Sequence, residues 1–125
     1  MACRFSELNV DSRDPEALAA FWSAVLDYRV LSREDGVVEI GPEAGFGGPA
    51  PTLVFAPVPD PTPGKVRLHI DLNPTDRDQD AELERLLSLG ATRADVGQTG
   101  EEGWHVLADP EGNEFCLLSR RLPPL

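Results

Sequence analysis

The amino-acid sequence predicts an α+β fold built from two βαβββ modules, because an order of strand, helix and three strands occurs twice. Glu7 lies in a short stretch of alternating polar and apolar residues, and Asp14, seven residues later, precedes a helix-like stretch. His69 and Asp76 have the same spacing, 62 residues further along a chain of 125. This internal repeat puts Glu7 and His69 at equivalent positions of the two modules.

The clearest strand signal lies in residues 65–76, where apolar residues alternate with polar ones. A period of two is typical of a strand with one buried and one polar face. The apolar set is Val66, Leu68, Ile70 and Leu72, and the polar set is Arg67, His69 and Asp71. Residues 3–10 form the matching strand of the first module, with Glu7 and Asn9 on its polar face. We expect chemistry-capable side chains on these two polar faces.

In the first module, Asp14, Pro15 and Glu16 indicate a helix start with a capping carboxylate, a proline at the first position and an acid near the positive end of the dipole. The apolar stripe of this helix is Leu18, Phe21, Trp22 and Val25. Strands are predicted over residues 28–33, 36–40 and 52–57, with a hairpin turn at 34–36 and a glycine- and proline-rich loop at 41–51.

In the second module, a helix is predicted from Asp76, with Gln79 completing a capping box, to Gly90. Further strands are predicted over residues 92–96, 103–108 and 114–118, with a turn at 109–113. The proline-rich residues 58–64 are an extended connector. We therefore predict a single domain over residues 1–125, with module 1 at about 3–57, the linker at about 58–64 and module 2 at about 65–120.

Each module alone would leave one face of its sheet uncovered. We expect the two modules to pack into one cupped, mixed and antiparallel sheet with the helices outside. The polar faces of the two first strands would then line the concave side.

The composition restricts the possible partners. The net charge of −11 argues against nucleic acid, whose binding depends on cationic contacts to phosphate, and favours a cationic or neutral small ligand. Apolar runs are too short for a membrane span, and the amino terminus does not resemble a signal peptide. The two cysteines, Cys3 and Cys116, are expected as thiols. We expect a cytoplasmic protein with no membrane partner.

The sequence resembles the vicinal oxygen chelate superfamily, which includes glyoxalase I, extradiol dioxygenases, and the fosfomycin and bleomycin resistance proteins. The resemblance covers nearly the whole chain and is most similar to the glyoxalase-like branch. It rests on the doubled layout and on the segments DPEALAAFW at 14–22, RLHIDL at 67–72 and DPEGNEF at 109–115. It implies the glyoxalase/bleomycin resistance/dihydroxybiphenyl dioxygenase fold and a homodimer.

In metal-dependent members of this superfamily, four ligands come from the first and last strands of the modules. The resemblance carries Glu7 and His69 over as ligands, places Cys116 where the family has Glu, and places Ala56 or a neighbour where a fourth ligand is expected. Glu, His and Cys can all bind zinc, and three protein ligands plus water form an open catalytic site. One expectation is thus a divalent metal (Zn, Ni, Mn or Fe), and the other is a cup without metal.

Each candidate residue also suits a structural role without catalysis or metal binding. Glu7 suits a structural ion pair with Arg67 as well as catalysis, and His69 suits a hydrogen-bonded lining position as well as acid–base work. Cys116 suits a small buried hydrophobe. Trp104 suits a pocket wall or plain packing. The predicted pocket lining is Asn9, Arg67, Asp71 and Trp104.

Three functions follow. The first is a small-molecule binding protein, for example a drug-sequestering resistance protein for a cationic antibiotic. The second is a lyase, isomerase or dioxygenase-type enzyme using Glu7, His69 and Cys116, in which a carboxylate or imidazole moves a proton beside a carbonyl. The third is a domain that serves only in association. The binding of a small organic molecule in the cup is common to the first two.

Overall fold

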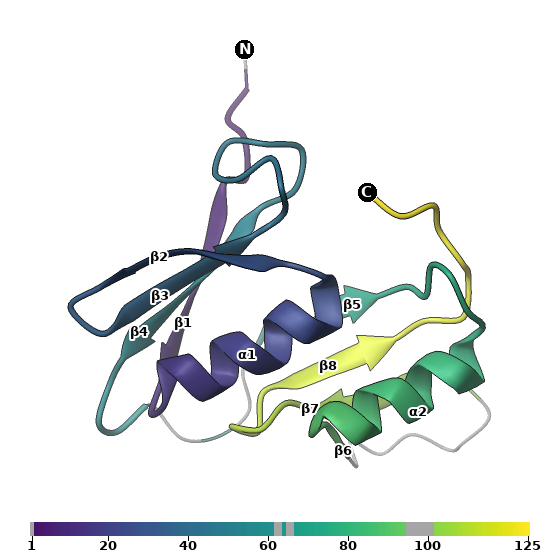
Figure 1. The fold of residues 1–125 in the computed structure, drawn as a ribbon. Coiled ribbons are helices and arrows are strands. Elements are labelled where there is room, and N and C mark those ends of the chain that lie inside the picture. The colour runs from purple at the N-terminus through teal and green to yellow at the C-terminus, as the bar shows by residue number, and fades with distance from the viewer. Residues whose placement is uncertain (1, 62–63, 65–66, 95–101) are drawn as a thin grey trace. The chain divides into compact units, whose positions relative to one another are not determined.

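The computed structural model describes residues 2–61, 64, 67–94 and 102–125, drawn in colour in Figure 1. The chain divides into two compact units, Met1–Pro63 and Gly64–Leu125. The division falls within the predicted proline-rich linker. Each unit is described by itself.

The first unit consists of one helix and a four-stranded mixed sheet. Its sheet has the order β1-β4-β3-β2, in which β1 is parallel to β4 and the other neighbours are antiparallel. The elements are β1 (Glu7–Ser12), α1 (Pro15–Leu26), β2 (Arg29–Glu34), β3 (Val37–Gly41) and β4 (Thr52–Pro57). The predicted order of strand, helix and three strands is confirmed for this half, although β1 begins and ends later than predicted.

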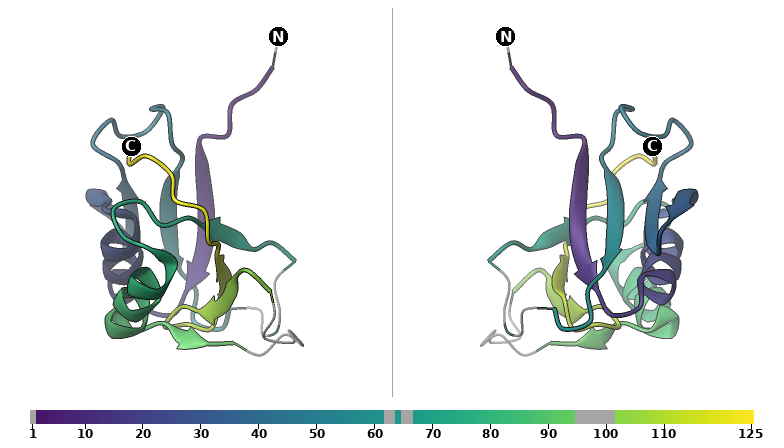
Figure 2. Two further views of the ribbon diagram at one scale, coloured as in Figure 1. Left: turned by 90° about the vertical axis from the view of Figure 1, so that its right-hand side faces the viewer. Right: turned by 90° about the vertical axis from the view of Figure 1, so that its left-hand side faces the viewer.

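Helix α1 begins where the sequence predicts. An oxygen of Asp14 accepts a hydrogen bond from the backbone N–H of Ala17 at 3.1 Å, and Pro15 occupies the first turn, where its missing N–H costs nothing. The helix ends at Asp27, which adopts the left-handed conformation with φ of 56°. Its predicted apolar stripe is buried, and Figure 2 shows the helix running along one face of the first sheet.

The predicted hairpin turn between β2 and β3 is confirmed by its backbone angles. Asp35 and Gly36 both have positive φ, 53° and 80°, which is the requirement of a two-residue turn matching the strand twist. A bulge between Val30 and Ser32 shifts the register of β2 against β3.

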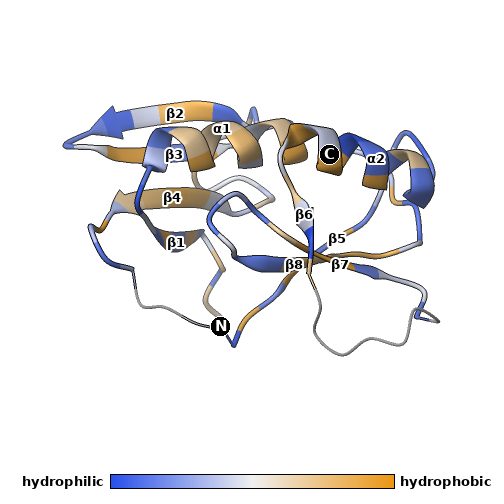
Figure 3. Cartoon of the chain, turned by 90° about the horizontal axis from the view of Figure 1, so that it is seen from below, coloured by the Kyte–Doolittle hydropathy of each residue, from blue (hydrophilic) through white to orange (hydrophobic). Residues whose placement is uncertain are grey.

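The core of the first unit lies between α1 and the sheet. On the helix, the rings of Phe21 and Trp22 pack edge to face with their centroids 5.3 Å apart. On the sheet, Ile40 and Phe55 are fully buried. In Figure 3, β4 is coloured as almost entirely hydrophobic, whereas the helix of the second unit, α2 (Gln79–Leu89), alternates between hydrophilic and hydrophobic residues. Such a difference is expected of a central strand and a surface helix.

Two side chains hold the second half of the loop between β3 and β4. The Arg4 guanidinium donates to the carbonyl oxygens of Gly47 and Gly48, at 2.9 and 2.6 Å. The Tyr28 hydroxyl donates to the carbonyl of Pro51 at 2.8 Å, and burial raises the pKa of Tyr28.

The second unit repeats the topology of the first. Its sheet has the order β5-β8-β7-β6, with β5 parallel to β8 and the other neighbours antiparallel. The elements are β5 (Ile70–Leu72), α2 (Gln79–Leu89), β6 (Thr92–Arg93), β7 (His105–Ala108) and β8 (Glu114–Leu117). The fold class is therefore α+β with two βαβββ modules, as predicted. The predicted cup between the modules stays a prediction.

Helix α2 begins later than the sequence predicts. Its N-cap is Asp78, whose side chain accepts from the backbone N–H of Ala81 at 2.9 Å, so the assignment of the helix start to Asp76 is wrong. Asp76 instead pairs with its neighbour Arg77, which lowers the pKa of the Asp76 carboxyl. Gln79 makes no capping box but donates to the carbonyls of Gly103 and Leu117.

Strand β5 is shorter than the alternation of residues 65–76 suggests. Only Ile70–Leu72 pair with β8, and Leu68, predicted to be buried, is 75% exposed. The physical reason is that β5 is an edge strand paired with β8. In the parallel register the first residue of β8, Glu114, lies opposite His69, so Leu68 and the residues before it lie beyond the start of β8. Val66 lies outside the described residues.

The turn before β8 is organised by a buried carboxylate. Asp109, 3% exposed, accepts hydrogen bonds from the backbone N–H groups of Glu111 and Asn113 and from the Asn113 side chain. The predicted turn at residues 109–113 is confirmed. The predicted strand over residues 92–96 is seen as Thr92–Arg93, and Val96 lies outside the described residues.

Candidate functional site

The first sheet has one face covered by α1 and a second face turned away from it. Alternation along the strands puts Glu7 and Asn9 of β1 on this second face, and the register places Asn9 beside Val54 and Val54 beside Glu39. Ser32 of β2 lies beside Glu39 in turn. We call this surface the open face of the first sheet.

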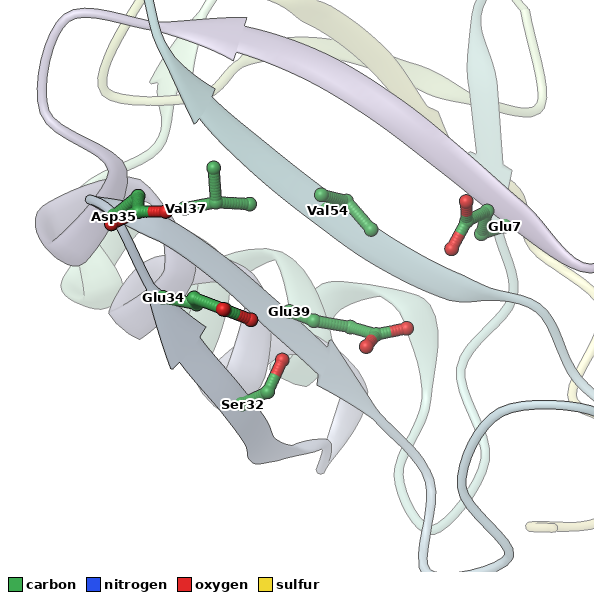
Figure 4. Close-up of a pocket in the computed structure, with 7 residues that line it drawn as sticks. All are labelled: Glu7, Ser32, Glu34, Asp35, Val37, Glu39 and Val54. Atoms are coloured by element: carbon green, nitrogen blue, oxygen red, sulfur yellow. The ribbon is translucent and has the colours of Figure 1, made fainter.

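A hollow of about 400 Å³ lies on the open face. Its lining comes from all four strands and the β2–β3 turn, and Figure 4 shows these side chains projecting from one side of the sheet. The lining residues are Glu7, Ser32, Glu34, Asp35, Val37, Glu39 and Val54.

The hollow combines carboxylates with a small apolar floor. Four of the seven lining side chains are acidic, and among these described residues none is basic. Figure 4 places Glu7 toward one end and Asp35 toward the other, with Val54 between them. Such a surface can accept several hydrogen bonds from a cation while the valines contact its carbon atoms.

Glu39 is the carboxylate most firmly held. Its Oε2 accepts a hydrogen bond at 2.9 Å from the hydroxyl of Thr52, a residue that is fully buried. Glu39 itself is half-buried, whereas Glu7, Glu34 and Asp35 are exposed. Partial burial of Glu39 and the hydrogen bond from the Thr52 hydroxyl fix the position of the Glu39 carboxylate.

Two of the predicted site residues belong to this open face. Glu7 lines the hollow, and Asn9 lies on the same face two residues later, although it is not among the lining residues. Both are exposed. The remaining predicted residues belong to the second unit.

In the second unit, Cys116 is the predicted residue with the most defined surroundings. It lies on β8 beside Asp71 of β5 and is 8% exposed. Burial raises the pKa of the Cys116 thiol, and the Asp71 charge, a hydrogen bond with Asp71 and the Glu114 charge raise it further. Oε2 of Glu114 is itself buried without a hydrogen-bond partner in the part of the chain that the structure describes. The free thiol expected at Cys116 is confirmed.

The other predicted residues of the second unit are exposed. His69 and Arg67 precede β5, outside any strand, and Trp104 precedes β7 with 46% of its surface exposed. The structure thus places Asp71 and Cys116 side by side.

The pairing registers identify the residue of the first unit that corresponds to Cys116. Asn9 pairs with Val54 as Asp71 pairs with Cys116, so Val54, a neighbour of Ala56, occupies the equivalent place. Valine has no metal-binding atom. Within each unit, the described His, Cys, Asp and Glu side chains form no group of three that could hold a metal ion.

The predicted metal set draws on both units, with Glu7 in the first and His69 and Cys116 in the second. A metal site shared by these three side chains stays a prediction. Among the described residues of either unit, no other group of three His, Cys, Asp or Glu side chains could hold a metal ion instead.

Sequence reasoning missed most of the hollow. It did not single out Ser32, Glu34, Asp35, Val37, Glu39 or Val54. A usable signal was present, because Ser32 and Glu34 alternate along one strand, and Val37 and Glu39 along the next, across a two-residue turn.

Comparisons with known proteins agree with this architecture. The family model described as a glyoxalase-like domain matches residues 7–118. A glyoxalase/bleomycin resistance protein/dioxygenase family enzyme from Burkholderia phytofirmans is 19% identical, with a TM-score of 0.69 over 92% of this chain and 97% of its own. A fosfomycin resistance protein from Mesorhizobium loti is 18% identical, with a TM-score of 0.68 over 98% and 95%. At these identities the structures support the fold alone.

A glyoxalase-related enzyme from Fulvimarina pelagi is 15% identical, with a TM-score of 0.64 over 91% of this chain and 86% of its own. A search of curated protein sequences finds no match. No helix among the described residues has the length and apolar character needed to cross a membrane.

Proposed function

Because the chain belongs to the family of glyoxalase-like domains, in the vicinal oxygen chelate superfamily, we propose that it binds a small organic cation on the open face of its first sheet. The single observation that carries this proposal is the hollow of about 400 Å³ with four carboxylates in its lining. Small-molecule sites are concave and combine apolar walls with a few polar groups.

The charge of the hollow selects the class of ligand. An anion would meet four carboxylates without a compensating basic group among the described lining residues, whereas an ammonium, guanidinium or amidinium group gains from each of them. The net charge of −11 adds long-range attraction of cations. Sequestration of a cationic drug is one biological use consistent with this chemistry.

A homodimer, implied by the resemblance, is part of the proposal, and light scattering that finds a monomer would contradict it.

The test compares three probes of one shape and different charge: benzamidinium, benzamide and benzoate. Calorimetric titration of the full chain is expected to detect benzamidinium binding that weakens with salt, because screening reduces exposed charge interactions. Benzamide and benzoate are expected to bind far more weakly. Equal binding of all three, or no binding of benzamidinium, contradicts the proposal.

A charge variant locates the site. Ser32→Arg puts a cation in the hollow and is expected to weaken benzamidinium binding about tenfold, because like charges about 4 Å apart repel by about 1–4 kcal/mol between bulk water and a protein surface. The matched control is Glu84→Gln on α2, which changes the net charge by the same amount outside the first sheet. An equal effect of both variants would mean that binding is not at the hollow.

A further inference from the structure

We propose that Thr52 is a positioning residue that fixes the Glu39 carboxylate as the anchor for the charged group of the ligand. This inference rests on the proposed function, because it names which carboxylate of the hollow binds the cation. It also adds two residues, Thr52 and Gly41, that do not line the hollow.

The geometry at Thr52 leaves its hydroxyl little freedom. The side chain is fully buried, its Oγ1 lies 2.9 Å from Oε2 of Glu39, and its backbone N–H donates to the carbonyl of Ser6 at 3.0 Å. A β-branched side chain is restricted at its first torsion, and in a packed strand it has few alternatives. The hydroxyl therefore holds the Glu39 carboxylate in one orientation.

Gly41 provides the space that this arrangement needs. A Cβ atom at Gly41 would lie 2.8 Å from Cγ2 of Thr52 and 2.7 Å from Cδ1 of Leu31, both too close. Any side chain there would displace Thr52 or Leu31. Gly41 is thus required for room and not for an unusual backbone angle.

A fixed carboxylate is a better anchor than a mobile one. Exposed Glu7 and Glu34 must lose side-chain freedom when they meet a ligand, which opposes binding, whereas Glu39 is already ordered by Thr52. A carboxylate offers about four lone-pair sites, so one bond from Thr52 leaves Glu39 able to accept from a ligand. Val54 beside Glu39 supplies apolar contact next to that charge.

The experiment measures benzamidinium affinity of the full chain by calorimetry for four variants. Thr52→Val keeps the shape and removes the hydroxyl, and it is expected to weaken binding about fivefold, because the Glu39 side chain then has to be ordered when the ligand binds. Thr52→Ser restores the hydroxyl and is expected to restore affinity. Glu39→Gln is expected to weaken binding by about tenfold or more, and Glu34→Gln, with the same charge change in the same hollow, by much less.

Two results would overturn the inference. Equal affinities of Thr52→Val and Thr52→Ser would remove the role of the hydroxyl, and equal losses in Glu39→Gln and Glu34→Gln would remove Glu39 as the anchor. If Thr52→Val does not fold, Gly41→Ala in the unmodified background is measured in its place. A Cβ at Gly41 would lie 2.8 Å from Cγ2 of Thr52 and displace that residue, so Gly41→Ala is expected to weaken binding, whereas Thr52→Ser is not.

The failure of the inference is distinguishable from the failure of the proposed function. If no cationic probe binds the unmodified chain, the proposed function fails, and with it the anchor role. Crystal structures of the unmodified chain and of Thr52→Val still test the positioning. The Glu39 carboxylate is expected to move or to lose order in the variant, and an unchanged position would overturn the role of Thr52.

Discussion

Cys116 shows how the surroundings of one residue set its chemistry. The sequence allowed either a metal ligand or a small buried hydrophobe at this position. The structure buries the thiol beside Asp71 and Glu114, and burial and both negative charges raise its pKa. At a given pH less thiolate is present than in an ordinary cysteine, and thiolate is the form that reacts and binds metals.

We predict that Cys116 is alkylated slowly by iodoacetamide and that Asp71→Asn speeds the reaction. The experiment uses a Cys3→Ser background, so that Cys116 is the thiol measured. Removal of the Asp71 charge is expected to move the pH profile of the alkylation rate toward lower pH and to raise the rate near pH 8 at least about fivefold. A like charge about 4 Å away raises the energy of the thiolate by about 1 kcal/mol even in water. Asp80→Asn on α2 is the matched control. A profile unaffected by Asp71→Asn would refute the account of the thiol.

The two helices show that a good local signal does not fix the residue at which an element begins. The segment before α1 holds a single acidic candidate next to proline, and Asp14 is the cap. The segment before α2 offers both Asp76, with Gln79 three residues later, and Asp78, which Gln79 and Asp80 follow directly. The choice of Asp78 depends on where the chain leaves β5 and on Gln79 binding Gly103 and Leu117.

We predict that Asp78→Ala lowers the free energy of unfolding by about 1 kcal/mol, because the N–H of Ala81 loses its acceptor. Urea unfolding measures this change. Asp78→Ser, which can still cap, is expected to recover most of it, and Asp76→Ala is expected to have a much smaller effect. A larger loss in Asp76→Ala than in Asp78→Ala would contradict the observed helix start.

At the scale of the whole molecule, the two units carry different parts of the predicted chemistry. The first holds the hollow with Glu7, and the second holds His69, Asp71 and Cys116. Ligand binding at the hollow uses residues of the first unit alone. A metal held by Glu7, His69 and Cys116 would need both units.

We predict that removal of metal ions leaves ligand binding unchanged. Protein treated with a chelator is expected to bind benzamidinium as tightly as untreated protein, because the carboxylates and valines of the hollow contact the cation directly. Elemental analysis of protein purified without chelator is the companion measurement. Stoichiometric zinc, nickel, manganese or iron that is lost in His69→Ala, together with loss of benzamidinium binding, would favour the metal-dependent alternative.

The features that depend on near neighbours in the chain could be predicted from the amino-acid sequence. The repeat of 62 residues, the cap at Asp14, the Asp35–Gly36 turn and the turn at Asp109 all follow from local spacing and residue type. The same patterns carried the resemblance to the superfamily, which the family model over residues 7–118 confirms.

The set of side chains that share one surface depends on how the strands pair in the folded chain. Strand pairing brings Glu39, Val54 and Ser32 together, limits β5 to Ile70–Leu72, and places Asp71 against Cys116. Except for Ser32 and Glu39, which share a hairpin, these contacts join residues far apart in the chain, and alternation alone cannot fix the register between strands. The acidic hollow arises from that register, which is why a search along the chain found Glu7 but not Glu39.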